Sequence, residues 1–291
     1  MIAIDSMMVC LDLSDIDEKL VAFTRSICER LQVGKVYFVH NIKVHELSED
    51  FREWFGNVDL AGEVEGNIND IVSEQFGNAA DYEVLVSEEP NTEVILADLV
   101  KRYKVKLTLL GKKMSNKSSG ALGTKLLHIL PCSVLVFPET ATFKIEKVLV
   151  PIDFSDTSVH ALKLSKNLSD QLGLQLDILH VYRLPTQYFP LISEDKAVRK
   201  AEEIVKERFA ALQKKHSEIA GVPYTLVRAA NKSIAERIRL HLDKGNHDLL
   251  VLGLKGNNPL PSLSFGGVPK EIYNMDLHIP LWLVYSEEVI K

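Results

Sequence analysis

The sequence contains no run that approaches the roughly 20 consecutive apolar residues that a membrane-spanning helix needs. The first residues, MIAIDSMMVCLDL, include Asp5 and Asp12 but no basic segment, so they do not predict a signal peptide. Cysteine is scarce, and Cys10, Cys28 and Cys132 form no Cys-x-x-Cys pair, which argues against a disulfide framework and a zinc ribbon. We therefore expect a reduced, cytoplasmic protein that does not bind membranes.

Motifs of several enzyme classes are also missing. There is no Gly-x4-Gly-Lys-Ser/Thr loop of the P-loop NTPases, and no Gly-x-Ser-x-Gly turn that would present a nucleophilic serine. The histidines do not predict a metal site, because His40 and His45 lie near the end of an expected strand and need not converge. We predict no catalytic residue, and at most slow ATP hydrolysis.

Positive charge is in short supply in the first half of the chain. Residues 1–143 hold 14 basic and 22 acidic residues, whereas residues 144–291 hold 20 and 18. Between Val44 and Val100 the only basic residue is Arg52, against 15 acidic ones. Because nucleic-acid binding depends largely on cationic contacts to phosphates, we do not expect a nucleic-acid partner.

The chain of 291 residues is long enough for two domains, and an internal repeat supports this division. Four landmarks recur in the same order at offsets of 140 to 149 residues. The pairs are VCLDLSD with VPIDFSD, VYFVHNIKV with LDILHVYRL, LTLLGKK with LLVLGLKG, and PCSVLVF with PLWLVYS. We predict two tandem domains, residues 1–142 and 143–291.

Each half alternates short apolar runs with longer segments of helical spacing. The runs are rich in Val, Ile and Leu and lack strict alternation, which is typical of strands buried on both faces. Asp15 with Glu18 predicts a capping box at one helix start, and Asp156 predicts an N-cap at another. The predicted fold is α/β: two doubly wound, Rossmann-like domains, each with a five-stranded parallel sheet and helices on both faces.

Ligands of doubly wound sheets bind beyond the carboxyl ends of the strands. Asp12 and Asp153 each follow the first strand of a half, within an Asp-x-Ser-Asp turn. A glycine-bearing loop, residues 253–267, follows the fourth strand of the second half, and the next helix is expected to begin near Val268. Glycines allow close backbone approach to a phosphate, and Lys255 would add a positive charge. The alternative is a glycine-rich surface turn without a ligand.

The combined motifs resemble those of the universal stress protein family across both halves. The family's nucleotide-binding members carry Gly-x2-Gly-x9-Gly-Ser/Thr after the fourth strand, and Gly253, Gly256 and Gly266 match this spacing. Gly267 departs from the pattern because it replaces the hydroxyl residue. Further matches are the Val-Pro-Ile-Asp turn at residues 150–153, His-Val at residues 180–181, and the prolines that precede both final strands.

The resemblance implies strand order 3-2-1-4-5 and an adenine-nucleotide pocket for ATP or AMP, mainly in the second half. The residues that it implies line the base, ribose and phosphates are Pro151, Ile152, Asp153, Val181, Leu252, Gly253, Lys255, Gly256, Gly266, Gly267 and Val268. A magnesium ion that accompanies the phosphates would lie near Asp153.

The first half departs further from the family pattern. It keeps Asp12 and Gly111, but Met114 occupies the second glycine position. Only eight residues separate Met114 from Gly123, although the adjacent Thr124 retains the hydroxyl. We expect a weaker second site at Asp12, Gly111, Gly123 and Thr124, or a domain that serves only as a structural partner.

The resemblance implies a stress-response role in which nucleotide binding is regulatory. A nucleotide-independent interaction scaffold is the main alternative, and slow ATP hydrolysis ranks below it. The protein partner is unknown. The duplication is consistent with a homodimer or with an intramolecular pseudo-dimer of the two halves.

Overall fold

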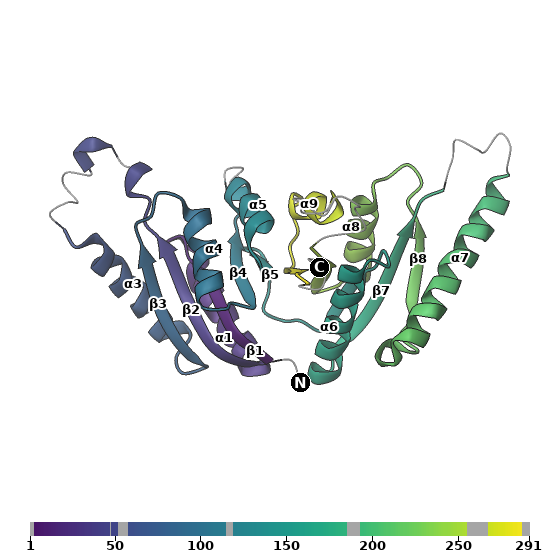
Figure 1. Ribbon diagram of the computed structural model, residues 1–291, viewed down its shortest axis with the longest axis horizontal. Coiled ribbons are helices and arrows are strands. Elements are labelled where there is room, and N and C mark those ends of the chain that lie inside the picture. Colours follow the sequence, from purple (N-terminus) through teal and green to yellow (C-terminus); the bar gives the residue numbers. More distant parts are fainter. Residues whose placement is uncertain are drawn as a thin grey trace. The chain divides into compact units, whose positions relative to one another are not determined.

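The computed structural model describes residues 3–46, 48–51, 58–114, 119–184, 193–254 and 267–286 (Figure 1). The chain divides into two compact units. The first comprises Met1–Phe143 with His278–Pro280, and the second comprises Lys144–Leu277 with Leu281–Lys291. No helix among the described residues is both long and apolar enough to cross a membrane.

The first unit is a parallel α/β sheet with strand order β3-β2-β1-β4-β5. Its strands are β1 (Ala3–Cys10), β2 (Gln32–Asn41), β3 (Asp81–Ser87), β4 (Leu107–Lys112) and β5 (Ser133–Pro138). Its helical elements are α1 (Ile16–Arg30), the 3-10 turn η1 (Val44–Glu46), α3 (Leu60–Gln75), α4 (Thr92–Arg102) and α5 (Ser119–Ile129). Helix α1 contacts α3, and α4 contacts α5.

The second unit repeats this topology, with parallel strands in the order β8-β7-β6-β9-β10. Its strands are β6 (Lys147–Pro151), β7 (Gln175–Tyr182), β8 (Tyr224–Arg228), β9 (Leu249–Gly253) and β10 (Leu281–Val284). Its helical elements are α6 (Asp156–Leu172), α7 (Glu194–Lys215), η3 (Ser217–Ile219), α8 (Ile234–Gly245) and α9 (Gly267–Tyr273). The predicted α/β class and the 3-2-1-4-5 order are confirmed in both units.

The central strands are buried on both faces, as their unbroken apolar runs predict. Consecutive residues Met7, Met8 and Val9 of β1 are all inaccessible to solvent. In β9, Leu249–Leu252 are likewise buried. Side chains on successive residues point to opposite faces of a sheet, so burial of consecutive residues requires helices on both sides.

Strand pairing corrects the alignment of the last repeat landmark. Met8 pairs with Thr108 in the first unit, and Leu149 pairs with Leu250 at the equivalent place in the second. Thr108 in turn pairs with Val134, and Leu250 pairs with Leu281. The final strands therefore correspond at an offset of 147, not at the 149 that aligns the two prolines. By this register Ser286 occupies the place of Glu139.

Two helix caps differ from the sequence prediction. Asp15 makes no side-chain cap hydrogen bond, so the capping box predicted with Glu18 is wrong. Helix α6 is capped by Ser155, which accepts the Ser158 N–H, and Asp156 is its first helical residue. The backbone explains the first difference, because Asp15 is already helical, with φ −55° and ψ −17°, whereas a capping residue has an extended backbone.

A buried polar cluster lies where the strands of the second unit begin. The His247 ring, of which 1% is exposed, contacts Asp177 Oδ2 at 3.0 Å through Nε2 and the Leu242 carbonyl at 3.3 Å through Nδ1. Lys147 Nζ lies 3.1 Å from Asp177 Oδ2 and also donates to the Gly245 carbonyl. Burial acts in the opposite direction, but hydrogen bonds from Lys147 and His247 hold the pKa of Asp177 below its usual value.

Candidate functional site

Each unit builds the same turn where its first two strands end. The Leu11 N–H donates to the Val39 carbonyl at 2.9 Å, and the Ile152 N–H donates to the Leu179 carbonyl at 2.8 Å. His40 contacts the Leu11 carbonyl through Nδ1 at 2.9 Å, and His180 contacts the Ile152 carbonyl at 2.7 Å. Since a carbonyl only accepts, both Nδ1 atoms carry a proton. Each histidine therefore stabilises its own turn through a hydrogen bond to the turn backbone.

The residue after each turn aspartate adopts a left-handed backbone conformation. Leu13 has a φ of 58° and Phe154 a φ of 64°, values that are uncommon for residues with a side chain. Strain of this kind persists only where the surrounding structure enforces it, and it is common at ligand sites. The same strained conformation follows the aspartate in both units, so Asp12 and Asp153 occupy equivalent positions of one repeated turn.

In the second unit, Asp153 is exposed and its carboxylate is oriented by Ser155. Asp153 Oδ1 accepts the Ser155 N–H at 2.9 Å and the Ser155 hydroxyl at 2.5 Å. Beside it, the end of β9 lies against the start of α6. A Cβ placed on Gly253 would lie 2.8 Å from the backbone carbon of Thr157 and 3.0 Å from the Ser158 nitrogen. No residue but glycine fits there without a backbone shift.

The other residues that the sequence assigned to this site divide into three groups. Pro151, Ile152, Val181 and Leu252 are buried at the ends of β6, β7 and β9. Gly267 and Val268 begin α9, and among the described residues nothing lies within 4 Å of a Cβ placed on Gly267. Lys255, Gly256 and Gly266 lie outside the described residues, so their predicted contacts with phosphate remain predictions.

An aromatic cluster adjoins Asp153 and was not anticipated. Phe154 lies 5.0 Å from the His180 ring and 4.9 Å from Phe209, measured between ring centroids. Phe209 stacks on Tyr224 at 3.8 Å. Burial, together with the nearby Arg208, lowers the pKa of His180, so its ring is neutral at neutral pH. The cluster gives the second unit a rigid aromatic wall next to the turn.

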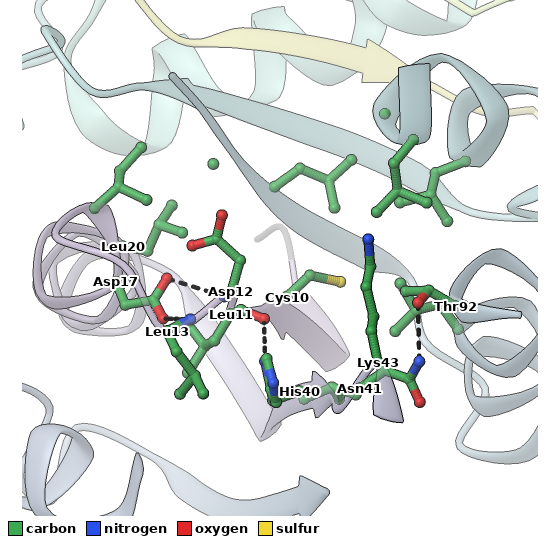
Figure 2. Close-up of a pocket in the computed structure, with 18 of the residues that line it drawn as sticks. Cys10, Leu11, Asp12, Leu13, Asp17, Leu20, His40, Asn41, Lys43 and Thr92 are labelled. Atoms are coloured by element: carbon green, nitrogen blue, oxygen red, sulfur yellow. Dashed lines mark hydrogen bonds between the residues drawn. The ribbon is translucent and has the colours of Figure 1, made fainter. Parts of the chain in front are cut away.

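The first unit contains a cavity of about 570 Å³ at the carboxyl ends of β1, β2 and β4 (Figure 2). Helices α1, α4 and α5 supply the rest of its wall. The described lining residues are Cys10, Leu11, Asp12, Leu13, Ile16, Asp17, Leu20, Val39, His40, Asn41, Ile42, Lys43, Thr92, Leu96, Leu110, Gly111, Lys113, Leu122, Gly123 and Leu126. The cavity therefore occupies the edge where ligands of doubly wound sheets bind.

Three of the four residues predicted for the weaker site meet around this cavity. Asp12, Gly111 and Gly123 line it, whereas Thr124 is not among the lining residues. Asp12 accepts a hydrogen bond from the Ser14 hydroxyl and forms an ion pair of 3.1 Å with Lys113. Figure 2 shows Asp12 and Lys43 extending into the space on either side of Cys10.

Asn41 occupies the place that Val181 holds in the second unit, and its amide is fully engaged. Its Nδ2 donates to the Glu89 carbonyl at 2.9 Å and to the Thr92 hydroxyl at 2.8 Å. Its Oδ1 accepts the Glu89 N–H at 3.1 Å. The amide thus ties the end of β2 to the start of α4. The repeat offset of 140 residues identifies this position from the sequence, because Asn41 is polar where the second unit has the apolar Val181.

Asp17 is a buried acid beneath the same turn, at the place of Ser158 in the second unit. Its carboxylate accepts the N–H groups of Asp12 at 3.3 Å and Leu13 at 2.8 Å, and the residue is 1% exposed. Burial outweighs these hydrogen bonds and raises the pKa of Asp17 to about 6. Burial also raises the pKa of the Cys10 thiol, which keeps it protonated.

Asp17 is expected to make the stability of the first unit depend on pH. A raised pKa means that the folded state binds the proton more tightly, so the contribution is complete below pH 3.8 and is lost as pH rises through 6. The free energy of unfolding of the wild type, relative to Asp17→Ser, should fall by roughly 2 kcal/mol between pH 4 and pH 7. Urea titrations of both proteins at each pH measure this difference. A difference that stays constant across the range would contradict the assignment.

Together, the fold and the two turns define a class: a tandem α/β protein whose units each present an aspartate-bearing turn at the ligand edge of a parallel sheet. Residues 144–274 match the model of the universal stress protein family. The second unit is therefore a universal stress protein domain, as the motifs indicated. The first unit shares its topology and repeats its strand-end hydrogen bonds.

Solved structures similar to the whole chain have the same fold. One is a functionally unknown protein from Pseudomonas aeruginosa PAO1, with a TM-score of 0.69 and 13% identity over 99% of this chain and 95% of its own. Another is a universal stress protein from Archaeoglobus fulgidus DSM 4304, with a TM-score of 0.63 and 16% identity over 98% and 97%. No curated protein sequence matches the chain.

Proposed function

We propose that the second unit binds an adenine nucleotide, ATP or AMP, and that this binding serves a regulatory role in a cytoplasmic stress response. The observation that carries the proposal is the juxtaposition of Asp153 with Gly253. An exposed, oriented carboxylate ends one central strand, and the neighbouring strand ends at a position that admits only glycine.

The chemistry of these residues suits a nucleoside. The carboxylate of Asp153 accepts hydrogen bonds, and both an adenine amino group and ribose hydroxyls donate them. Ile152 and Val181 provide apolar surface beside it, which suits a base that buries its ring on binding. A magnesium ion bound to the phosphates would find an oxygen ligand in Asp153. The same residues include no evident general base for hydrolysis, so we propose binding rather than catalysis.

Calorimetric titration of the full chain with ATP and with AMP, each with magnesium, tests the proposal. Asp153→Ala is expected to raise the dissociation constant at least tenfold, because it removes the charged acceptor to which the nucleotide would donate hydrogen bonds. Asp12→Ala is the matched control, since it makes the same change at the equivalent turn of the first unit, and it should alter the constant less than twofold.

Two outcomes would overturn the assignment. A larger loss with Asp12→Ala than with Asp153→Ala would move the nucleotide to the first unit. An absence of binding by the wild type at millimolar ATP and AMP would favour the second candidate function, a nucleotide-independent interaction scaffold. That candidate draws support from Gly267, which offers no hydroxyl where the resemblance leads one to expect it.

A further inference from the structure

The cavity of the first unit has an aliphatic interior. Leu11 and Leu110 reach it from the strand ends, Leu96 comes from α4, and Leu122 and Leu126 come from α5. Apart from His40, no aromatic side chain is among the lining residues that the structure describes. Walls of this kind bury an uncharged apolar body through the hydrophobic effect and offer few polar groups to a hydrophilic one.

The charged groups of the described lining are balanced, and both of its lysines are paired with carboxylates. The described lining holds two acids, Asp12 and Asp17, and two lysines, Lys43 and Lys113. Lys113 Nζ lies 3.1 Å from Asp12 Oδ2, and Lys43 Nζ lies 3.0 Å from Glu46 Oε1. An entering anion would compete with an existing carboxylate for either ammonium group, and it would experience repulsion from that carboxylate.

A third acidic side chain takes a backbone donor in the loop after β4. The Met114 N–H donates to Glu139 Oε1 at 2.9 Å, one residue beyond the lining residue Lys113. Glu139 is held in place through its own backbone, because its N–H donates to the Lys112 carbonyl at 3.0 Å and its carbonyl accepts from Lys19 Nζ at 3.0 Å. At the equivalent place the second unit has Ser286, which is short and uncharged.

In each of these pairs, a carboxylate is bonded to a group that would otherwise attract an anion. Free ammonium groups and loop N–H groups at the end of a strand are the usual donors to phosphates and carboxylates. In the first unit Asp12, Glu46 and Glu139 already supply the carboxylates. The volume of about 570 Å³ nevertheless lies within the range of small-molecule pockets.

We propose that the first unit binds an uncharged, largely aliphatic small molecule in this cavity, and that Asp12 and Glu139 exclude anionic ligands of the same size. This assignment goes beyond the nucleotide site of the second unit and does not depend on it. Under the two proposals, the second unit binds an anionic ligand and the first unit binds an uncharged one.

Fluorescence of the uncharged probe N-phenyl-1-naphthylamine, added to the full chain at pH 8, tests the proposal. The probe should bind, and 1-octanol should displace it at a concentration at least tenfold lower than octanoate does. These competitors share the same chain length and differ in charge, so their ratio isolates the exclusion of anions. Millimolar ATP should leave the probe in place.

Two pairs of variants locate the ligand and the source of the selectivity. Leu122→Trp fills the cavity from α5 and should weaken probe binding at least fivefold, whereas Ile129→Trp, on the same helix but 42% exposed, should leave it unchanged. The double variant Asp12→Asn with Glu139→Gln frees Lys113 and the Met114 N–H. It should strengthen octanoate binding at least fivefold and leave octanol binding unchanged.

The proposal fails if the wild type does not bind the probe, or if octanoate displaces it as well as octanol does. It also fails if the selectivity survives in the double variant, a result that remains informative should Leu122→Trp not fold. Loss of nucleotide binding in Asp153→Ala, measured separately, bears only on the second unit, so the two assignments can fail independently.

Discussion

Replacing Gly253 with alanine is expected to lower the free energy of unfolding of the second unit by about 3 kcal/mol. The added methyl group would lie 2.8 Å from the backbone carbon of Thr157 and 3.0 Å from the backbone nitrogen of Ser158. Backbone atoms at a helix start cannot rotate away as a side chain can, so β9 and α6 must separate. Urea unfolding followed by the fluorescence of Trp282, in a Trp54→Phe background, reports on this unit.

Two other glycines serve as matched controls for Gly253→Ala. At Gly111, the equivalent position of the first unit, the three atoms nearest the new methyl are side-chain carbons of Leu20 and Ile16, at 3.0 to 3.3 Å. Side chains yield more readily, so we expect a loss of about 1 kcal/mol. At Gly267 no atom of the described residues lies within 4 Å, and alanine should be neutral or slightly stabilising at a helical position. Equal losses at Gly253 and Gly111 would refute the backbone argument.

The close approach at Gly253 also has a functional consequence. A displaced end of β9 would shift the strand relative to the turn that presents Asp153. We therefore expect Gly253→Ala to weaken nucleotide binding in addition to stability, while Gly267→Ala leaves the close approach unchanged.

Replacing His247 with alanine is expected to destabilise the second unit by about 4 kcal/mol. The ring is 1% exposed, so its removal leaves a buried space. It also removes the contacts to Leu242 and Asp177, and only Lys147 of the cluster then remains beside the Asp177 carboxylate. The variant also leaves the Asp177 carboxylate, of which 28% is exposed, without one of its hydrogen-bond partners.

His241 provides the control for this prediction. It lies on α8, six residues before His247, with its ring centroid 5.8 Å from that of His247, but it is less buried. His241→Ala should cost less than 1 kcal/mol. Thermal and urea unfolding of both variants give the comparison, and a cost for His247→Ala no larger than that for His241→Ala would contradict the role of the cluster.

The same cluster predicts how the His247 effect changes with pH. The pKa of Asp177 lies below its usual value in the folded protein, so its contribution is present above the unfolded pKa of 3.8 and is lost as pH falls further. The difference between the wild type and His247→Ala should therefore shrink in acid.

Local sequence patterns were sufficient to predict the elements and the α/β class, whereas the strand order came from the family resemblance. Apolar runs without alternation predicted strands such as β1 and β9, and the recurrence of Asp-x-Ser-Asp and of the glycine-bearing loops predicted a duplicated sheet. These patterns are reliable because burial on two faces and sharp turns both constrain residue type at neighbouring positions. The helix caps were predicted less well, because an N-cap needs an extended backbone, whereas Asp15 is already helical and Ser155, not Asp156, is the extended residue before α6.

Only part of the candidate site could be predicted from the sequence. Asp12, Gly111 and Gly123 follow from the repeat, and the structure places them around one cavity. The roles of Asp17 and Asn41 were not predicted, because each depends on contacts that no motif records: Asp17 with the turn above it, and Asn41 with the start of α4.

The sequence by itself determined the α/β class, the duplication and the positions of the two turn aspartates, since each depends on residues close together in the chain. Only the tertiary structure decided the character of the first unit's cavity. Parallel strands bring their carboxyl ends to one edge of the sheet, so residues distant in the chain meet there. Asp12 forms an ion pair with Lys113, and Glu139 accepts the Met114 N–H. The charge of a site depends on such pairs, so the composition of a segment does not reveal it.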